Sequence, residues 1–529
     1  MSALRSLRVA AIGLTAAALL AVPAPAGAGT SSTRSASRPA TSVRLSVMTQ
    51  NMFYGGDDYD LRTGGFCPVA DGCPKALHRI AAAIVKAKAD VVGLQEPERN
   101  TAVLAGLLGW YSSPRAHVIS RYPIIEPPGS GGMYVFVEPA PGRVVAVADF
   151  HLPSTPYGPY EVRDGATRRQ VLKLENSLRV PYMTQQLEAL QRLEAQGYAI
   201  FVTGDFNSPS YLDWTAAVAK VRSDVKYPVR WPVSYLFARA GFGDSYRDVY
   251  PDPVARPGFT WTPGGPETDP HEVFDRIDWV LHAGPVTTLD SQIVGETGGP
   301  DVDIAVPAPY PSDHRGVVST FRVDALKPLP FAATQQRRII QGDTISVQWQ
   351  LGGAPGERVG VVRRTASGDV WVRSITPRVD FGRAPIAIGR LAPGRYDVVL
   401  ADHAGRVRTR EPVYVYRPTD HPTVHAAKAT FRVGETLRFS WTEAPGNGLD
   451  WIGVFPCTAK GRCGDNSTYL LYTYTQTAIE GSLSIGADRG GFEGTSAPWP
   501  LPPGSYVARL LIDDSYVSIG HSSVFHIVP

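Results

Sequence analysis

The sequence predicts an α/β (α+β) protein, a four-layer sandwich of two packed β-sheets flanked by helices, followed by two all-β sandwich modules. Two observations support this prediction. Over residues 43–323 short apolar runs alternate with amphipathic helical patterns, which is typical of sheets covered by helices. After residue 323 the helical periodicity ends and turn-separated β runs take over. The length of 529 residues also exceeds what one hydrophobic core supports.

The first 30 residues have the pattern of a secretory signal. Arg5 and Arg8 precede an apolar run from Val9 to Val22, and Ala24-Pro-Ala26-Gly-Ala28 supplies small residues for cleavage. This run is too short to span a bilayer, and no later stretch is apolar enough to do so. We therefore expect a signal peptide at residues 1–30, a disordered spacer at 31–42, and a secreted, extracellular protein without a transmembrane segment.

Residues 43–323 are expected to form the first domain. Two amphipathic helices are predicted, Ala76–Ala89 and Thr184–Ala195, the second beginning after Pro181. The first would bury Leu77, Ile80, Ala81, Ile84 and Val85, and the second Leu187, Leu190 and Leu193. Strands are predicted at Val43–Met48, Val91–Leu94, Val118–Ser120, Tyr134–Val137, Val144–Ala148, Ile200–Val202, Trp279–Leu281 and Val317–Val323.

The remaining chain contains an internal repeat. Gly342-Asp-Thr-Ile-Ser-Val-Gln-Trp349 matches Gly434-Glu-Thr-Leu-Arg-Phe-Ser-Trp441, and later segments match in the same order. This predicts two copies of one β-sandwich, at residues 330–418 and 424–529. The Asp450-Trp-Ile-Gly-Val-Phe455 stretch resembles the immunoglobulin-like and SKICH-like tails appended to phosphatases and related hydrolases. Neither repeat shows a convergent set of titratable groups, so we assign them no chemistry; a surface polymer or another protein are their candidate ligands.

The four cysteines form two close pairs, Cys67 with Cys73 and Cys457 with Cys463, each in a Gly/Pro/Asp-rich loop. In an exported chain two local disulfides are expected. A zinc site would require the two distant pairs to meet, and neither pair has a CxxC spacing.

The charge balance bears on the substrate. Residues 43–323 contain 26 Lys and Arg against 31 Asp and Glu, a net charge of −5. This domain lacks the basic balance of a dedicated nucleic-acid binder, although a local basic patch would be compatible with it.

Polar residues lie at one end of nearly every predicted strand of the first domain, either just after the strand or just before it. They include Gln50-Asn51, Gln95-Glu96, Asp149-Phe-His151, Gly204-Asp-Phe-Asn207, Arg276-Ile-Asp278 and Ser312-Asp-His314. Each alone is explained by turn chemistry or an exposed loop. Six such strand ends in one domain indicate a shared site, because sites in layered α/β folds gather where strands stop.

With Ser120-Arg-Tyr-Pro123, this ordered set resembles the endonuclease/exonuclease/phosphatase superfamily. The resemblance covers residues 43–323 and implies the deoxyribonuclease I-like fold, whose members cleave phosphate esters with Mg²⁺. It therefore predicts a metal-dependent phosphoric ester hydrolase. Mn²⁺ and Ca²⁺ are alternative cations.

The resemblance and the chemistry of phosphate-ester cleavage assign the same roles. Glu96, the amide oxygen of Asn51 and Asp313 are the expected metal ligands. Asp205 is the expected base or orienting acceptor for water, and Asn207 would hold the nucleophile or a phosphoryl oxygen. His151 and His314 would donate to the phosphate as imidazolium, with Asp278 pairing with His314.

The sequence leaves several classes of phosphate ester open as the substrate. We expect a phosphodiesterase or nuclease acting by in-line attack of water, with a sphingomyelinase-type phospholipase C or an extracellular phosphatase as alternatives. The substrate would be a nucleic acid or a phospholipid head group. The loop from His151 to Tyr160 is expected to form a substrate-facing wall through Tyr157 and Tyr160. A non-catalytic, surface-binding protein is the alternative from another class.

Overall fold

A computed structural model describes residues 40–56, 59–60, 65–66, 75–266, 269, 271–389, 391–458, 461–486 and 499–529 of the chain. The predicted signal peptide, residues 31–39 of the predicted spacer, and Cys67 and Cys73 lie outside the described residues. None of the described helices is long and apolar enough to cross a membrane.

Two β-sheets form the centre of the first domain, joined by one pair of residues, Leu326 of β15 and Val144 of β9. In the first sheet the strand order is β14-β13-β15-β1-β4-β6-β5, and in the second it is β11-β12-β10-β9-β8-β7. The first comprises β1 (Ala40–Asn51), β4 (Val91–Gln95), β5 (Tyr111–Ser113), β6 (Val118–Ser120), β13 (Val286–Glu296), β14 (Ile304–Val306) and β15 (Gly316–Leu326). The second comprises β7 (Ile124–Ile125), β8 (Val135–Ala140), β9 (Arg143–His151), β10 (Ile200–Asp205), β11 (Gly243–Asp244) and β12 (Asp278–Ala283).

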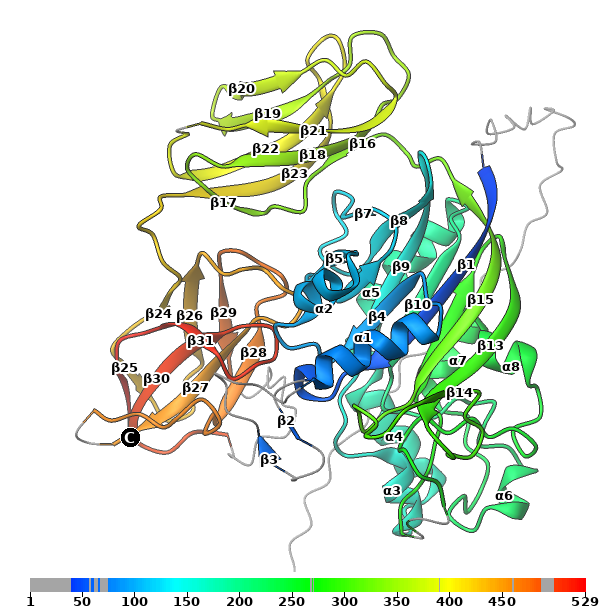
Figure 1. Ribbon diagram of the computed structural model, residues 1–529. Coiled ribbons are helices and arrows are strands. Elements are labelled where there is room, and N and C mark those ends of the chain that lie inside the picture. The colour runs from blue at the N-terminus through cyan, green and yellow to red at the C-terminus, as the bar shows by residue number, and fades with distance from the viewer. Residues whose placement is uncertain are drawn as a thin grey trace, which may run out of the picture. The chain divides into compact units, whose positions relative to one another are not determined.

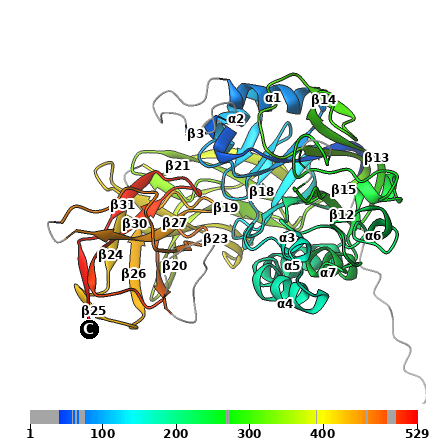
Figure 2. The same ribbon diagram turned by 90° about the horizontal axis from the view of Figure 1, so that it is seen from below.

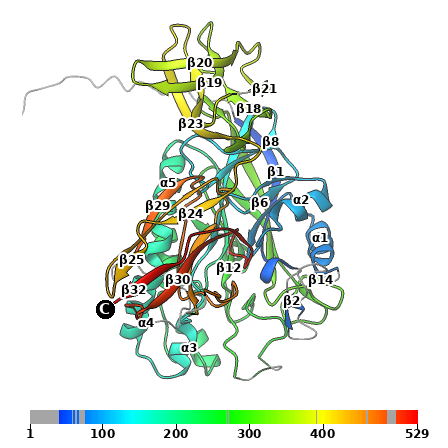
Figure 3. The same cartoon turned by 90° about the vertical axis from the view of Figure 1, so that its left-hand side faces the viewer.

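Helices cover the outer faces of both sheets, which confirms the predicted four layers. Helices α1 (Ala76–Lys86) and α2 (Thr101–Leu108) pack on the first sheet, while α5 (Val180–Ala195) and α7 (Pro232–Arg239) pack on the second. Figures 2 and 3 show these two helix groups on opposite sides of the strands. Between the sheets lies an apolar layer that includes Leu45, Val147, Phe201 and Phe321. The other described helices of the domain are η1 (Tyr54–Gly56), α3 (Gly158–Arg163), α4 (Arg168–Leu178), α6 (Val218–Val221) and α8 (Ser245–Val249).

The helix predictions are correct in kind and differ at their ends. In α1 the expected face is buried except Val85, whose side chain is 62% exposed and lies in the last turn. Helix α5 begins at Val180, so Pro181 lies inside its first turn rather than before it. Proline is tolerated there because the first-turn N–H groups have no helical acceptor. Between β1 and α1 in the chain, β2 (Tyr59–Asp60) and β3 (Gly65–Phe66) pair as a two-stranded sheet.

The later chain forms two β-sandwiches of the same topology, as the sequence repeat predicts (Figure 1). The first packs β16-β18-β21 against β17-β23-β22-β19-β20, and the second packs β24-β26-β29 against β25-β32-β30-β27-β28, with β31 added beside β30. In the first copy the strands are β16 (Phe331–Ala333), β17 (Arg338–Ile340), β18 (Thr344–Gln350), β19 (Arg358–Thr365), β20 (Gly368–Ile375), β21 (Phe381–Ala387), β22 (Gly394–Ala401) and β23 (Val407–Tyr416). In the second they are β24 (Thr423–Ala426), β25 (Thr430–Arg432), β26 (Leu437–Thr442), β27 (Trp451–Cys457), β28 (Leu471–Tyr474), β29 (Gly481–Ile485), β30 (Gly504–Leu511), β31 (Ser518–His521) and β32 (Phe525–Val528).

The first sandwich shares a hydrophobic core with the first domain. Phe331 and Ala333 of β16 belong to the same buried cluster as Ile125, Phe136 and Tyr198. The OH of Tyr198 also accepts a hydrogen bond from the backbone N–H of Leu329 at 3.0 Å. The two modules are therefore packed together through apolar contacts.

The second sandwich contacts the first domain through polar groups. Arg115 donates through Nη1 to the carbonyl oxygens of Gly446 and Thr477, at 3.0 and 2.9 Å. Buried His117 lies 2.7 Å from Asp513 Oδ1 through its Nε2. Burial would lower the pKa of His117, but the neighbouring Asp513 carboxylate outweighs burial and the pKa is raised.

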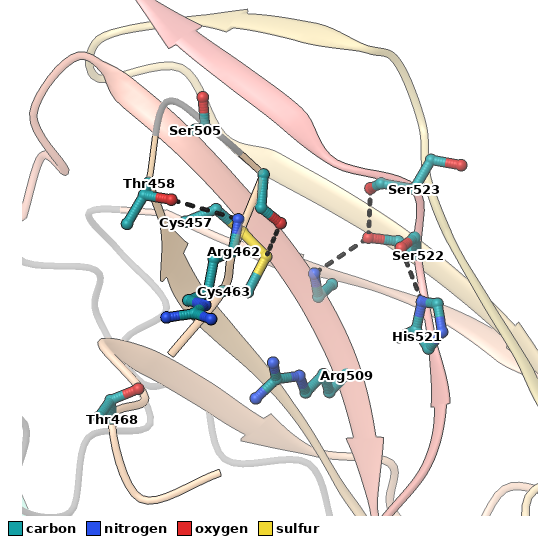
Figure 4. The surroundings of a disulfide bond; sticks show 12 residues. Cys457, Thr458, Arg462, Cys463, Thr468, Ser505, Arg509, His521, Ser522 and Ser523 are labelled. Carbon is teal, nitrogen blue, oxygen red and sulfur yellow. Dashed lines mark hydrogen bonds between the residues drawn. A yellow bond between two sulfur atoms is a disulfide. The ribbon is translucent and has the colours of Figure 1, made fainter. Parts of the chain in front are cut away.

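Within this module Cys457 and Cys463 form the predicted disulfide (Figure 4). It closes the loop that follows β27, where the backbone N–H of Arg462 donates to Thr458 Oγ1 at 3.2 Å. The loop is the insertion that distinguishes the second repeat from the first.

Candidate functional site

Strand pairing brings the predicted residues to one edge of the two sheets. In the second sheet, parallel pairing sets His151 of β9 beside Asp205 of β10, and antiparallel pairing sets Asp205 beside Asp278 of β12. In the first sheet, Asn51 at the end of β1 lies beside Gln95 at the end of β4, so Glu96 follows immediately. The hydrogen bond from Asn51 to Asp205 joins these two groups, so the ends of five strands meet at one place.

Asp205 lies at the centre of this group. Its Oδ2 accepts a hydrogen bond from Asn51 Nδ2 at 3.1 Å and lies 3.5 Å from His314 Nε2 and 3.8 Å from His151 Nε2. Its Oδ1 accepts from the backbone N–H of Asn207 at 2.9 Å. Burial raises the pKa of Asp205, with the two histidines acting in the opposite direction.

The expected pair of Asp278 and His314 is present. His314 Nδ1 and Asp278 Oδ2 are 3.0 Å apart, and both residues are buried. Burial would lower the pKa of His314, but Asp278 and then Asp205 outweigh it, and the pKa is raised well above its usual value. This rise favours the protonated form of His314, whose Nε2 lies 3.5 Å from Asp205 Oδ2.

Two backbone N–H groups hold Asp278 in place. The buried hydroxyl oxygen of Thr260 accepts from the N–H groups of Ile277 and Asp278, at 3.0 and 3.1 Å. The ring of Trp261 packs on that of His314 with centroids 4.9 Å apart. Thr260 was not predicted; a Thr-Trp pair before the Asp278 motif is the only sequence signal for it.

Glu96 and Asn51 form the opposite side of the group. Glu96 Oε1 accepts from Asn51 Nδ2 at 3.2 Å and lies 3.8 Å from His151, while Oε2 accepts from the backbone N–H of Tyr54 at 3.0 Å. The Asn51 amide oxygen accepts from the Phe53 N–H at 2.9 Å. The nitrogen of Asn51, and not the oxygen assigned to the metal, thus faces the carboxylates.

Asn207 also differs in detail from its expected role. Its side-chain nitrogen donates to the carbonyl oxygen of Leu152 at 3.0 Å, which ties it to the segment after β9. Its backbone N–H fixes Asp205, as described above. In this structure Asn207 orients the central carboxylate.

The donor set suits a hard divalent cation. Asp313 Oδ1 is buried and has no hydrogen-bond partner among the described residues. Burial raises the pKa of Asp313 to about 7, and the carboxylates of Glu96 and Asp205 add to the rise while His314 opposes it. A cation held by oxygen ligands would compensate this concentration of carboxylates. Asp205, Asp278 and His314 also place one potential ligand atom each within 4.8 Å of one another.

A buried polar layer supports the site from behind. Asp149 Oδ1 accepts from Gln95 Nε2 and from Thr203 Oγ1, each at 2.7 Å, and thereby links β4 of one sheet to β9 and β10 of the other. The sheets approach so closely here that a Cβ on Gly93 would lie 1.8 Å from Thr203 Oγ1. Only Gly fits at this crossing.

A cavity of about 240 Å³ opens beside Glu96 and His151. Ser154 and Thr155 line it, together with residues of the second sandwich that we call the aromatic wall: Trp451, Tyr469, Tyr472, Asp514 and Tyr516. Sequence reasoning missed this wall, because no chemistry was assigned to the repeats. The run Tyr469-Leu-Leu-Tyr472-Thr-Tyr474, which has no equivalent in the first repeat, was the available signal.

The predicted tyrosine wall is wrong. Tyr157 is buried and donates to Asp275 Oδ2 at 3.2 Å, and Tyr160 donates to Glu272 Oε1 at 2.7 Å. The two rings pack on each other with centroids 4.8 Å apart. The loop turns at Tyr157 into α3, so its tyrosines support the fold and only its first residues reach the cavity.

Comparisons with known proteins cover the same part of the chain. The model of the Endonuclease/Exonuclease/phosphatase family matches residues 49–314, which contain every predicted metal and catalytic residue. An uncharacterized protein of Caenorhabditis elegans is 31% identical over 268 residues, which are 46% of this chain and 84% of that protein.

Two of the solved structures that are similar to the chain are described here. An endonuclease/exonuclease/phosphatase from Beutenbergia cavernae has 18% identity and a TM-score of 0.32, with coverage of 70% of this chain and 99% of that one. An AP endonuclease from Archaeoglobus fulgidus has 16% identity and a TM-score of 0.33, with coverage of 52% and 98%.

Proposed function

Since this chain belongs to the endonuclease/exonuclease/phosphatase family and is a phosphoric ester hydrolase, we propose that it is a secreted, Mg²⁺-dependent phosphodiesterase. The observation that carries the proposal is the convergence on Asp205 of an amide, Asn51, and two imidazoles, His151 and His314. These groups hold a carboxylate acceptor next to a positively charged donor. Attack of water on phosphorus requires both.

Asp205 is proposed to orient the attacking water and accept its proton. The Asn207 N–H and the Asn51 amide hold the carboxylate at both oxygens, so it has little freedom to turn. Its burial favours proton uptake, because burial disfavours the charged form.

His314 is proposed to donate to a phosphoryl oxygen through Nε2. The hydrogen bond of Nδ1 to Asp278 fixes the ring orientation and keeps the imidazolium charged. Charge then develops on the phosphoryl oxygen opposite a donor that is already in place. His151, on the far side of Asp205, is proposed as the second donor.

Glu96 and Asp313 would hold the cation, while the side-chain nitrogen of Asn51 remains bonded to Asp205. When bound, Mg²⁺ supplies charge neutralisation at the phosphoryl oxygens. The orphaned Asp313 Oδ1 supports this assignment. The pairing of Asp278 with His314 argues that these two residues act together instead of serving as ligands.

A substrate panel tests the proposal: plasmid DNA, RNA, sphingomyelin, bis-p-nitrophenyl phosphate and p-nitrophenyl phosphate, each with Mg²⁺ and with EDTA. We expect hydrolysis of at least one diester, abolished by EDTA and restored by Mg²⁺. Hydrolysis of the monoester alone would replace the diesterase with a phosphatase, and no turnover of any ester would overturn the proposal.

Export is proposed from the N-terminal signal pattern and is supported by the Cys457–Cys463 disulfide, since disulfides persist in oxidising compartments. The test is expression of the full chain in a secreting host, followed by N-terminal sequencing of protein from the medium. Cleavage close to residue 30 is expected, and retention of an uncleaved chain in the cell contradicts export.

A further inference from the structure

The cavity beside the catalytic residues is built by two modules. From the first domain Tyr54, Glu96, Glu98 and His151 line it, and from the second sandwich the aromatic wall lines it. Asp514 is close enough to His151 and Glu96 for their charges to influence its pKa, which burial raises. The wall is thus within the electrostatic range of the catalytic centre.

The loop that carries Asp514 and Tyr516 is anchored at its preceding residue. Asp513 pairs with His117 of the first domain at 2.7 Å, and its backbone N–H donates to Asp450 Oδ1 at 3.1 Å. The Tyr474 hydroxyl donates to Asp514 Oδ1 at 3.0 Å. These contacts give Asp514 a defined position beside the cavity.

The aromatic rings of the wall are arranged edge to face. The centroid of Trp451 lies 5.4 Å from Tyr469 and 5.6 Å from Tyr472, with the ring planes at 73° and 72°. Tyr516 lies 6.5 Å from Trp451 at 87°. Tyr469 and Tyr516 are instead nearly parallel, with centroids 6.4 Å apart and ring planes at 27°. The π faces of aromatic rings attract cations, so an aromatic lining of this kind suits a positively charged group.

The charged residues that line the cavity also favour a positively charged ligand. Its lining contains three carboxylates, Glu96, Glu98 and Asp514, and no Lys or Arg lines it within the described part of the chain. If Glu96 holds the metal, the carboxylate of Asp514 remains beside the cavity to face a second positive charge. A nucleic-acid strand would instead require basic groups along its backbone.

We propose that this cavity binds the alkylammonium group of a phosphodiester substrate, so that the second sandwich completes the active site and selects a cationic ester. This inference rests on the proposed function and specifies its substrate class. A cavity of about 240 Å³ is smaller than a typical small-molecule site of roughly 300 Å³ or more, so it suits a small head group better than a large ligand.

The test uses two chromogenic diesters with the same leaving group on the full-length protein. One is p-nitrophenyl phosphorylcholine, and the other is its neutral carbon isostere, p-nitrophenyl 3,3-dimethylbutyl phosphate. We expect kcat/KM to favour the cationic ester by about tenfold or more, as aromatic and acidic recognition of an ammonium group predicts. Equal rates would overturn the inference while leaving the proposed diesterase intact.

Two wall variants and one matched control locate the effect. Asp514→Asn and Tyr516→Leu should each reduce the cationic-to-neutral ratio of kcat/KM by several-fold. Glu480→Gln removes an exposed carboxylate of the same sandwich that does not line the cavity, and it should keep the wild-type ratio. A ratio unchanged by both wall variants contradicts the inference.

Calorimetry with EDTA-treated protein gives a readout that does not depend on catalysis. Choline should bind and 3,3-dimethyl-1-butanol, its neutral isostere, should not. Selective choline binding without turnover of any ester would support the cation pocket and refute the proposed function. Equal binding of both compounds, or binding of neither, would refute the cation pocket.

Sphingomyelin in mixed micelles, compared with soluble glycerophosphocholine, separates a lipid source of the ammonium group from a soluble one.

Discussion

The two sides of the cavity are built in different ways. The catalytic side consists of side chains at strand ends, where pairing between β9, β10 and β12 sets His151, Asp205 and Asp278 next to one another. The aromatic wall stands mainly on loops and edges of a β-sandwich whose twin copy has the same topology and does not line the cavity. Hydrolytic chemistry thus depends on the register of a sheet, whereas recognition depends on loops docked against it.

This contrast predicts the largest effect at the centre of the catalytic side. Asp205→Asn keeps the size of the side chain and removes the acceptor charge, so kcat/KM should fall by about 10²- to 10⁴-fold for cationic and neutral esters alike. Asp252→Asn, at an exposed loop position, is the matched control and should keep wild-type rates. A loss restricted to the cationic ester would place Asp205 in recognition instead.

A smaller effect is expected at the metal ligand. Glu96→Gln should raise the Mg²⁺ concentration needed for half-maximal activity by about tenfold or more, because a carboxylate ligand loses its charge. Excess Mg²⁺ should restore part of the rate. Mn²⁺ binding measured by electron paramagnetic resonance should weaken in parallel; undiminished binding would remove Glu96 from the ligand set.

The contact that holds the wall should mainly affect stability and recognition. His117→Gln leaves the buried Asp513 carboxylate without its charged partner, and breaking a buried pair in this way costs about 3–5 kcal/mol. Chemical unfolding should show this loss, and the preference for the cationic ester should fall in the folded variant. An unchanged unfolding free energy would mean that the pair does not secure the module.

The pH dependence of this contact has a defined sign. The pKa of His117 is raised in the folded protein, so its contribution is fully present below about pH 6.5, the unfolded reference value, and is lost as pH rises through the folded pKa. The difference in unfolding free energy between wild type and His117→Gln should therefore shrink on going from acidic to alkaline pH. A difference that grows with pH would contradict the assigned charge state.

The smallest effect is expected from the disulfide of the second sandwich. Replacing Cys457 and Cys463 together by Ser opens a short loop, for which chain entropy predicts a loss of about 2 kcal/mol. Unfolding should shift while kcat/KM for the neutral ester stays near wild type. A large catalytic loss would show that the loop supports the site directly.

Much of the catalytic side could be predicted from sequence because its residues are tied to strand ends. Asp205 and Asn207 follow a short apolar run, and their companions recur in family order from Gln50 to His314. Local sequence does not specify which atom of an amide faces a carboxylate. The orientations of Asn51 and Asn207 therefore depend on neighbours such as Phe53 and Leu152.

The recognition side was not predictable in the same way. The loop after His151 was assigned the tyrosine wall from its proximity in sequence, yet Tyr157 turns inward to bond with Asp275, more than a hundred residues later. The residues that do line the cavity begin at Trp451, far from the catalytic residues in sequence. They become neighbours of those residues only because the second sandwich packs against the first domain. Composition could mark those aromatic residues as unusual but could not say what they face.

The apolar contact between β16 and the first domain determines what a truncated form of this protein would expose. Phe331 and Ala333 belong to a buried cluster that also contains Ile125 and Phe136. A chain that ended at residue 323 would therefore expose part of this apolar cluster to water. Losing the first sandwich would uncover the catalytic core, and the second sandwich follows it in the chain. The first domain and the first sandwich are thus expected to unfold together as one cooperative unit.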